Sequence, residues 1–162
     1  SCKDFKMLVS HGVYHVKEDI TDALLDRVRT DPNCARSLMG NKFEDVVTPE
    51  TQWHTLMWGT IPVGAVMRDA SIANGFQCCH IHLLDEYKDK ERATILTQLS
   101  ALASLIRGVR PFTTVSRAES YDYMRKFLTG CGFVSYTCNP QGQVFIVPSD
   151  WVPTFQRASI LF

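Results

Sequence analysis

The stretch HIHLLDEYKDKERATIL, from His80 to Leu96, decides how this chain is interpreted. Its first residues continue an apolar run, and the pattern over Phe76 to Leu84 predicts a strand. From Lys90 to Leu105 apolar residues recur at helical spacing, through Ile95, Leu99, Leu102 and Ile106, and predict a helix. Strand therefore gives way to helix across Asp85 to Asp89.

The residues before this junction predict a strand, two helices and a hairpin. The first strand has a break at Gly12, and the hairpin turns at Gly59-Thr60. These elements are expected at residues 5–16, 17–29, 32–39, 53–58 and 61–67. The segment from Arg68 to Gly75 is expected to be a loop, and residues 41–50 form a polar stretch before the hairpin.

The residues after the junction predict a strand, a helix and a second hairpin that turns at Asn139-Pro140-Gln141-Gly142. These elements are expected at residues 109–115, 119–128, 133–138 and 143–147. The whole order predicts an α/β fold: one domain over residues 1–162, with a mixed, mostly antiparallel sheet and helices on both faces. The tail, residues 148–162, is so apolar that it is expected to dock on its own domain or on a partner.

Composition limits the classes of partner. The 162 residues are 45% hydrophobic, and 17 basic side chains balance 17 acidic ones. No strong positive field would attract nucleic acid, and no apolar run is long enough to span a bilayer. The opening residues do not have the pattern of a signal peptide, so a cytoplasmic protein is expected, with no nucleic-acid or membrane partner.

The cysteine and histidine residues do not predict a metal site. The six cysteines form no C-x-x-C motif, and the adjacent Cys78 and Cys79 are expected to point to opposite faces of a strand. His11, His15 and His54 are scattered without a carboxylate or thiol at ligand spacing. No bound metal is expected.

Three segments resemble the GNAT (Gcn5-related N-acyltransferase) superfamily. They are WGTIPVGAV from Trp58 to Val66, the junction from His80 to Leu96, and YMRKFLTGCGFVSY from Tyr123 to Tyr136. The phrase K-F-L-x-x-x-G-F in the third segment combines a helix end, a glycine stop and an aromatic strand start. The resemblance covers roughly 60% of the chain, about residues 53–147.

The resemblance implies acetyl-coenzyme A as a cofactor. Backbone groups near Leu83 and Leu84 would hold the pantetheine arm, and the loop that leads into the helix would hold the phosphates. The loop positions carried over are Lys88, Lys90, Arg92 and Ala93. This loop departs from the family's glycine-rich pattern, because Glu91 stands at the key glycine and Asp89 adds a second carboxylate that repels phosphate.

The resemblance also implies catalytic positions. The family's general acid is a tyrosine, but Leu128 stands at that position, so Tyr121 or Tyr123 would have to replace it. His80 and His82 share one face of the predicted strand, and His82 or Glu86 is the candidate general base that would deprotonate an amine. The alternatives are a structural histidine and a solvated glutamate.

Two functions remain open from the sequence. The first is an acetyl-coenzyme A dependent N-acyltransferase that acts on a primary amine. The second is a protein with little or no catalysis, because the altered loop is also similar to GNAT-like internal virion or assembly proteins of short-tailed bacteriophages. In the second case the tail would bind viral structural proteins, and the protein would be found in the host cytoplasm and the virion.

Overall fold

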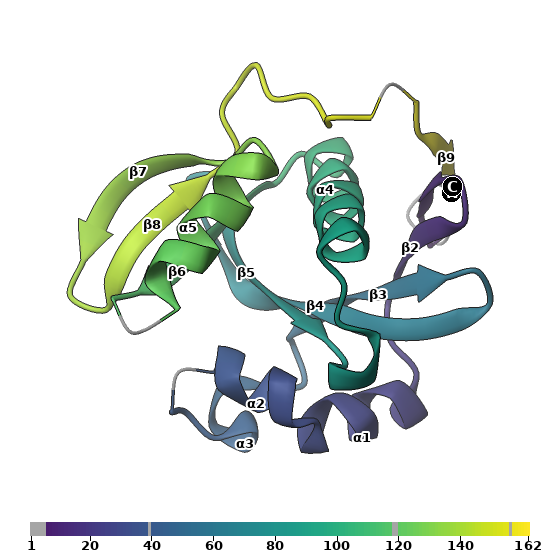
Figure 1. Ribbon diagram of the computed structural model, residues 1–162, viewed down its shortest axis with the longest axis horizontal. Coiled ribbons are helices and arrows are strands. Elements are labelled where there is room, and N and C mark those ends of the chain that lie inside the picture. The colour runs from purple at the N-terminus through teal and green to yellow at the C-terminus, as the bar shows by residue number, and fades with distance from the viewer. Residues whose placement is uncertain (1–5, 39, 118–119, 156) are drawn as a thin grey trace.

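A nine-stranded sheet forms the centre of the protein (Figure 1). The computed structural model describes residues 6–38, 40–117, 120–155 and 157–162. The strands lie in the order β7-β8-β6-β5-β4-β3-β2-β1-β9. Their bounds are β1 Leu8–His11, β2 Tyr14–Glu18, β3 Gln52–Trp58, β4 Ile61–Ala73, β5 Phe76–Leu83, β6 Arg110–Ser116, β7 Val134–Asn139, β8 Gly142–Ile146 and β9 Ser159–Leu161.

The helices cover both faces of this sheet. Their bounds are α1 Asp22–Thr30, α2 Pro32–Ser37, α3 Phe43–Val46, α4 Lys90–Ile106 and α5 Tyr121–Gly130, with a 3₁₀ turn η2 at Asp85–Tyr87. The first three helices pack on one face, over Trp53, Ala65 and Met67, whereas α4 and α5 pack on the other (Figure 1). No helix in the described parts of the chain is both long and apolar enough to cross a membrane.

The sheet is antiparallel except where β5 and β6 meet, which confirms the predicted mixed sheet. These two strands pair in parallel at Phe76↔Arg110, Gln77↔Pro111 and Cys78↔Phe112. The pairing ends there, and Pro111 has no N–H to donate within it. From Phe112 onward β6 pairs with β8, while β5 continues to Leu83 beside β4, so β5 and β6 diverge.

The N-terminal region differs from the sequence prediction in two places. Residues 8–18 form a hairpin rather than a single strand, because Gly12 turns the chain at φ +59°; the predicted start at Phe5 lies outside the described residues. The first helix begins at Asp22, not Lys17, because Lys17 and Glu18 pair with β3. Tertiary pairing thus overrides the helical pattern of residues 17–21.

One predicted loop and one polar stretch contain regular structure. Arg68 to Ala73 extend β4, and the turn is instead at Asn74-Gly75, whose φ angles of +54° and +81° suit a tight hairpin. The polar stretch 41–50 contains the short helix α3, which buries Phe43 against Trp53. Both elements are held by contacts with residues distant in sequence.

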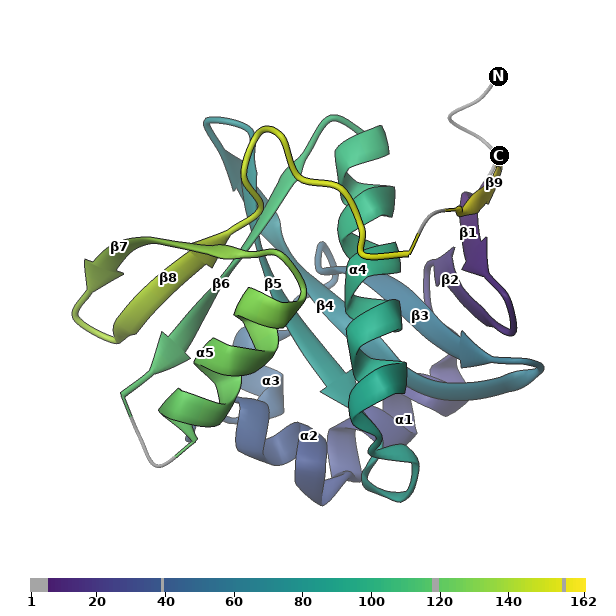
Figure 2. The same cartoon turned by 45° about the horizontal axis from the view of Figure 1, so that its top comes forward.

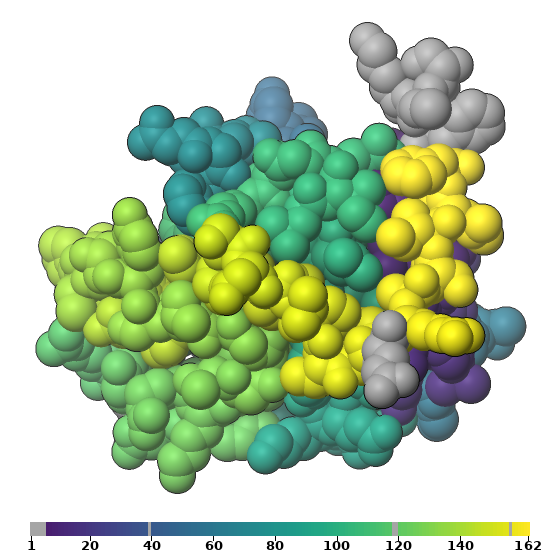
Figure 3. All heavy atoms as spheres, turned by 90° about the horizontal axis from the view of Figure 1, so that it is seen from above, coloured from purple at the N-terminus to yellow at the C-terminus, as the bar shows by residue number. Residues whose placement is uncertain are grey.

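The tail docks on its own domain, one of the two predicted alternatives. It crosses α4 and ends as β9, which pairs with β1 (Figures 2 and 3). The Trp151 Nε1–H donates to the Cys131 carbonyl at 2.9 Å. The buried Gln98 of α4 accepts from Thr154 N at 2.7 Å, and Phe155 stacks on His11 at 4.3 Å.

A buried polar chain links α4 to the sheet. Arg68 is only 6% exposed and donates to His54 Nε2 and to Gln77 Oε1, both at 3.1 Å. Since His54 Nε2 accepts, its Nδ1 carries the proton and donates to Ser100 Oγ at 2.8 Å. Burial and the adjacent guanidinium lower the pKa of His54 well below its usual value, so the ring is neutral.

The tail contact generates a stability prediction at Gly132. A Cβ at this position would lie 2.7 Å from Trp151 Nε1, and its φ of +88° disfavours any side chain. Gly132→Ala should therefore lower the free energy of unfolding by about 1–3 kcal/mol, measured by urea denaturation. Gly130→Ala is the matched control, because a Cβ there meets nothing within 4 Å. Equal stability of the two variants would contradict the proposed packing.

Candidate functional site

The divergence of β5 and β6 forms the centre of the candidate site. On the α4 and α5 side the gap holds a cavity of about 50 Å³, lined by Cys79 and Ile81 of β5, Thr97 of α4, and Leu128 of α5. That volume accommodates about one or two waters. Thr97 Oγ1 is buried here without a partner among the described residues, and it is a suitable contact for such a water.

The N-terminus of α4 is capped by the side-chain carboxylate of the residue that precedes the helix. Asp89 is the N-cap residue, and its Oδ1 accepts from Arg92 N at 2.9 Å. A helix N-terminus binds phosphate through its free N–H groups, and here one of them is already bonded to an anion. A phosphate at this position would also meet the negative charge of Asp89 at short range.

The basic residues of this loop do not form a phosphate cluster. Arg92 donates to the Tyr87 carbonyl at 2.7 Å, and its guanidinium lies 4.2 Å from the centroid of the Trp58 ring. Lys88 and Lys90 are exposed, and Ala93 is half-buried in the first turn of α4. Arg92 is therefore held against the β3–β4 hairpin.

The end of β5 is bonded to α2. The Leu83 carbonyl accepts from Asn33 Nδ2 at 2.6 Å and from the Cys34 thiol at 3.7 Å. The Asp31 carboxylate accepts from Asp85 N at 3.0 Å, and Leu84 N donates to the Val63 carbonyl at 2.9 Å. Three backbone groups at this strand end thus have partners within the chain: the Leu83 carbonyl and the N–H groups of Leu84 and Asp85.

His82, one predicted general base, is buried at 1% exposure beneath α2. Ser37 Oγ donates to the Cys34 carbonyl at 2.7 Å, so it accepts from His82 Nδ1–H at 2.7 Å. Burial, reinforced by the neighbouring His80, lowers the pKa of His82 to about 4. Its Nε2 is buried without a partner among the described residues. In this conformation His82 has no access to a dissolved substrate.

The other predicted catalytic residues lie on the surface. Glu86 of η2 forms an ion pair with Arg27 of α1, and its side chain is 55% exposed. Tyr123 of α5 is 60% exposed, while Leu128 is buried next to the cavity. Glu86 is therefore paired with a cation, and the structure does not bring it together with His82 and Tyr123 in one cluster.

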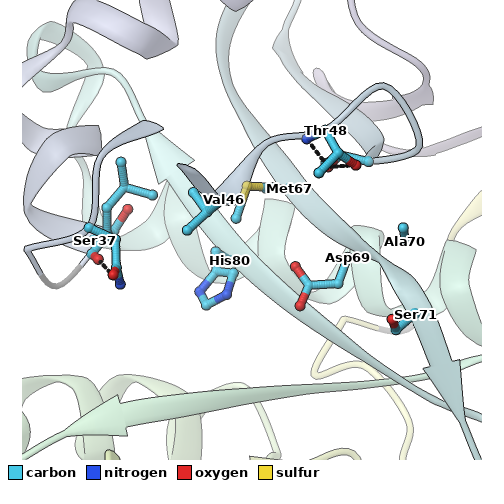
Figure 4. A pocket seen from close by; sticks show the side chains of 11 residues that line it. Ser37, Val46, Thr48, Met67, Asp69, Ala70, Ser71 and His80 are labelled. Carbon is cyan, nitrogen blue, oxygen red and sulfur yellow. Dashed lines mark hydrogen bonds between the residues drawn. The ribbon is translucent and has the colours of Figure 1, made fainter. Parts of the chain in front are cut away.

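A larger pocket lies on the opposite face of the sheet, under α2 and α3 (Figure 4). Its volume is about 370 Å³, and Asp69 of β4 and His80 of β5 point into it. From the sequence, His80 was expected only to share a strand face with His82, and Asp69 was expected in a loop. The missed signal was the Asn74-Gly75 turn, which extends β4 through Asp69.

The His80 ring, which lines this pocket, also contacts a cysteine thiol. The Cys78 thiol lies 3.4 Å from His80 Nε2. Burial, with a smaller contribution from Asp69, raises the pKa of Cys78 to about 12, so the thiol keeps its proton. Burial also lowers the pKa of His80, partly opposed by Asp69, and the imidazole is neutral near pH 7.

Cys79 points to the other face and packs against the α4 core, which confirms that the two adjacent cysteines face opposite sides. No group of three His, Cys, Asp or Glu side chains in the described ranges is placed to hold a metal ion.

No protein-family model and no curated protein sequence matches this chain. Solved structures do match it. The GNAT domain of S. lividans PAT has a TM-score of 0.62 at 15% identity, over 83% of this chain and 89% of that one. A spermidine N-acetyltransferase SpeG chimera from Vibrio cholerae and hSSAT has a TM-score of 0.59 at 13% identity, over 83% and 93%. A GNAT-family acetyltransferase from Bacillus anthracis has a TM-score of 0.58 at 10% identity, over 86% and 95%. The chain has the GNAT fold.

The buried His82 generates a pH prediction. Its pKa is about 4 when folded and near 6.5 when unfolded, so the unfolded chain binds more protons below pH 6.5. Stability is therefore complete above pH 6.5 and is lost as the pH falls towards 4. His82→Gln should lose about 2 kcal/mol less than the parent protein between pH 7.5 and 5.0, measured by urea unfolding. An identical pH dependence in both proteins would show that His82 titrates normally.

Proposed function

We propose that this chain, which has the GNAT fold, does not bind acetyl-coenzyme A in the manner of an acyltransferase and serves as an assembly protein of the virion-associated type. The observation that carries the first part is the Asp89 carboxylate on the N-terminus of α4. It occupies the helix end where an acyl-coenzyme A would place its phosphates.

Two further features support a closed cofactor site. The Asn33 side chain already donates a hydrogen bond to the Leu83 carbonyl. The cavity of about 50 Å³ between β5 and β6 is far smaller than a pantetheine arm. The residues present therefore do not fit the cofactor. Acyl transfer at this site would require α2 to move away from the end of β5.

The assembly role is supported by exposed apolar side chains on the docked tail. Leu161 is 63% exposed and Phe162 55% exposed; Leu161 ends β9, an edge strand of the sheet, and Phe162 follows it. A sheet edge with apolar side chains can accept another strand or surface. A viral structural protein is the partner that the sequence resemblance suggests.

The second candidate, an N-acyltransferase acting on a primary amine, is favoured by one observation. β5 and β6 still diverge after Cys78, as the GNAT fold requires for a cofactor between them. His82 and Glu86 remain its proposed bases and Tyr123 its proposed acid. Cofactor binding discriminates between the two functions.

Acetyl-coenzyme A at 1 mM should leave the melting temperature of the full chain unchanged, as measured by differential scanning fluorimetry. A ligand at ~100 times its Kd stabilises a protein by about 2.7 kcal/mol, which is an easily measured shift. An active acetyltransferase of the same fold provides the positive control. A clear upward shift for this chain would support the enzyme and overturn the closed-site proposal.

The tail proposal predicts that Leu161→Ser combined with Phe162→Ser reduces incorporation into particles. Both side chains are largely exposed, so the fold should be retained. Incorporation is measured by mass spectrometry of particles purified from the system that encodes the chain. Tyr123→Ser, which removes an exposed aromatic from α5, is the control and should be incorporated normally. Normal incorporation of the tail variant would exclude this docking surface.

A further inference from the structure

The outer strand β7 is an exposed edge of the sheet. Within the part of the chain that the structure describes, it pairs with β8 on one side only, because the strand order ends with β7. All six of its residues are exposed. The β7–β8 hairpin extends to one side, away from α1, α2 and α3 (Figures 1 and 2). An edge strand presents a row of backbone N–H and C=O groups to any strand that can pair with it.

The sequence of β7, Val-Ser-Tyr-Thr-Cys-Asn, contains no charged residue and no proline, which are the residue types that protect a sheet edge. One protective feature is present, a bulge at Tyr136, where the register shifts between Ser135 and Thr137. Gln143 of β8 braces this bulge, because its Nε2 donates to Ser135 Oγ at 2.7 Å and to the Thr137 carbonyl at 2.9 Å. The strand is therefore held beside β8 on both sides of the bulge.

The sheet face next to this edge is apolar. Val134 lies opposite Ile146, which lies opposite Phe112, so the three side chains share one face of the sheet. Phe145, the neighbour of Ile146, packs in the core under α5. Because successive residues of a strand point to opposite faces, the row from Val134 to Phe112 lies on the face away from α5.

Tyr136 adds an exposed aromatic ring to this region. Its ring centroid lies 6.3 Å from that of Phe76, and the Arg110 guanidinium lies 5.7 Å from the Phe76 centroid. Tyr136 is 64% exposed and Val134 is 42% exposed. Apolar and aromatic side chains that gather on one surface are typical of an interaction site.

A second copy of the chain is the partner that suits this edge. In a two-fold contact a strand pairs antiparallel with its own copy, so every charge on the strand would face a like charge close by. β7 carries no charge, and its copy has the same length and twist. A strongly charged partner would find no complementary charge on this strand. The opposite edge strand, β9, has only three residues and offers fewer backbone groups for such pairing.

We infer that two copies of this chain associate through antiparallel pairing of their β7 strands, with Val134 and Tyr136 of both copies packed together near the two-fold axis. The pairing would join the two sheets into one. Because one strand and a few side chains make a small interface, the dimer is expected to form at micromolar concentrations. The inference goes beyond the assembly role, which concerns the tail at the other edge of the sheet.

Sedimentation equilibrium of the full chain, from about 1 to 200 µM, tests whether the dimer forms. The expected result is a reversible equilibrium between monomer and dimer that saturates at the dimer. A chain that stays monomeric over this range would overturn the inference. Assemblies that keep growing beyond the dimer would also overturn it, since they require a head-to-tail contact between different surfaces.

Hydrogen exchange measured by mass spectrometry locates the contact without any variant. Backbone amides of β7 should exchange more slowly at concentrations where the dimer predominates, because pairing gives them new acceptors. Amides of β9 should exchange at the same rate at every concentration. Concentration-dependent protection at β9 and none at β7 would place the contact at the wrong edge.

Charge-introducing variants test the side chains. Tyr136→Lys should weaken the dimer at least tenfold, because it brings two like charges together near the axis, whereas Tyr136→Phe should dimerise like the parent protein. Tyr123→Lys on α5, where the tyrosine is 60% exposed, is the matched control and should not change the dissociation constant. An unchanged dissociation constant in Tyr136→Lys, with an unchanged melting temperature, would reject β7 as the interface.

The tail variant separates this inference from the proposed function. Leu161→Ser combined with Phe162→Ser alters the β9 edge and should dimerise like the parent protein, whatever its incorporation into particles. Loss of the dimer in the tail variant would move the contact to β9 and overturn the β7 inference.

Discussion

The short parallel pairing of β5 with β6 is the constraint on which the site depends. It lasts for the three residue pairs from Phe76↔Arg110 to Cys78↔Phe112, after which each strand follows a different antiparallel partner. Strands that diverge expose backbone groups along the gap, and buried backbone groups require partners. In this protein α2 supplies one such partner, because the Asn33 side chain donates a hydrogen bond to the Leu83 carbonyl. In a GNAT acyltransferase a cofactor would occupy this gap.

The N-terminus of α4 follows the same principle. A helix begins with unpaired N–H groups that need an acceptor, which can be a ligand or a side chain. Asp89 supplies the acceptor from within the chain. One N–H group of the α4 N-terminus and the Leu83 carbonyl, both of which could recognise a cofactor, are thus bonded within the chain. These bonds support the proposed role as a scaffold.

The two faces of the sheet then have different chemistry. The α4 face holds a buried cation, Arg68, bonded to the neutral side chains of His54 and Gln77. The other face holds a half-buried carboxylate, Asp69, at an open pocket. Adjacent residues of β4 point in opposite directions, so one strand contributes both groups. Gln77 connects them, since it bonds to the Arg68 side chain and to the Asp69 carbonyl.

The sequence by itself determined the α/β class, the strand-to-helix junction at Asp85 to Asp89, the shared face of His80 and His82, and the altered phosphate loop. These features follow from local periodicity and from the residue types at a helix start. Only the tertiary structure decided that β4 extends to Ala73, that His82 is buried, that Asp69 faces a pocket and that the tail docks as β9. Each of these depends on contacts between residues far apart in the chain. Local sequence patterns do not encode which distant residues form hydrogen bonds with a strand edge, or which ones cover a side chain and exclude water from it.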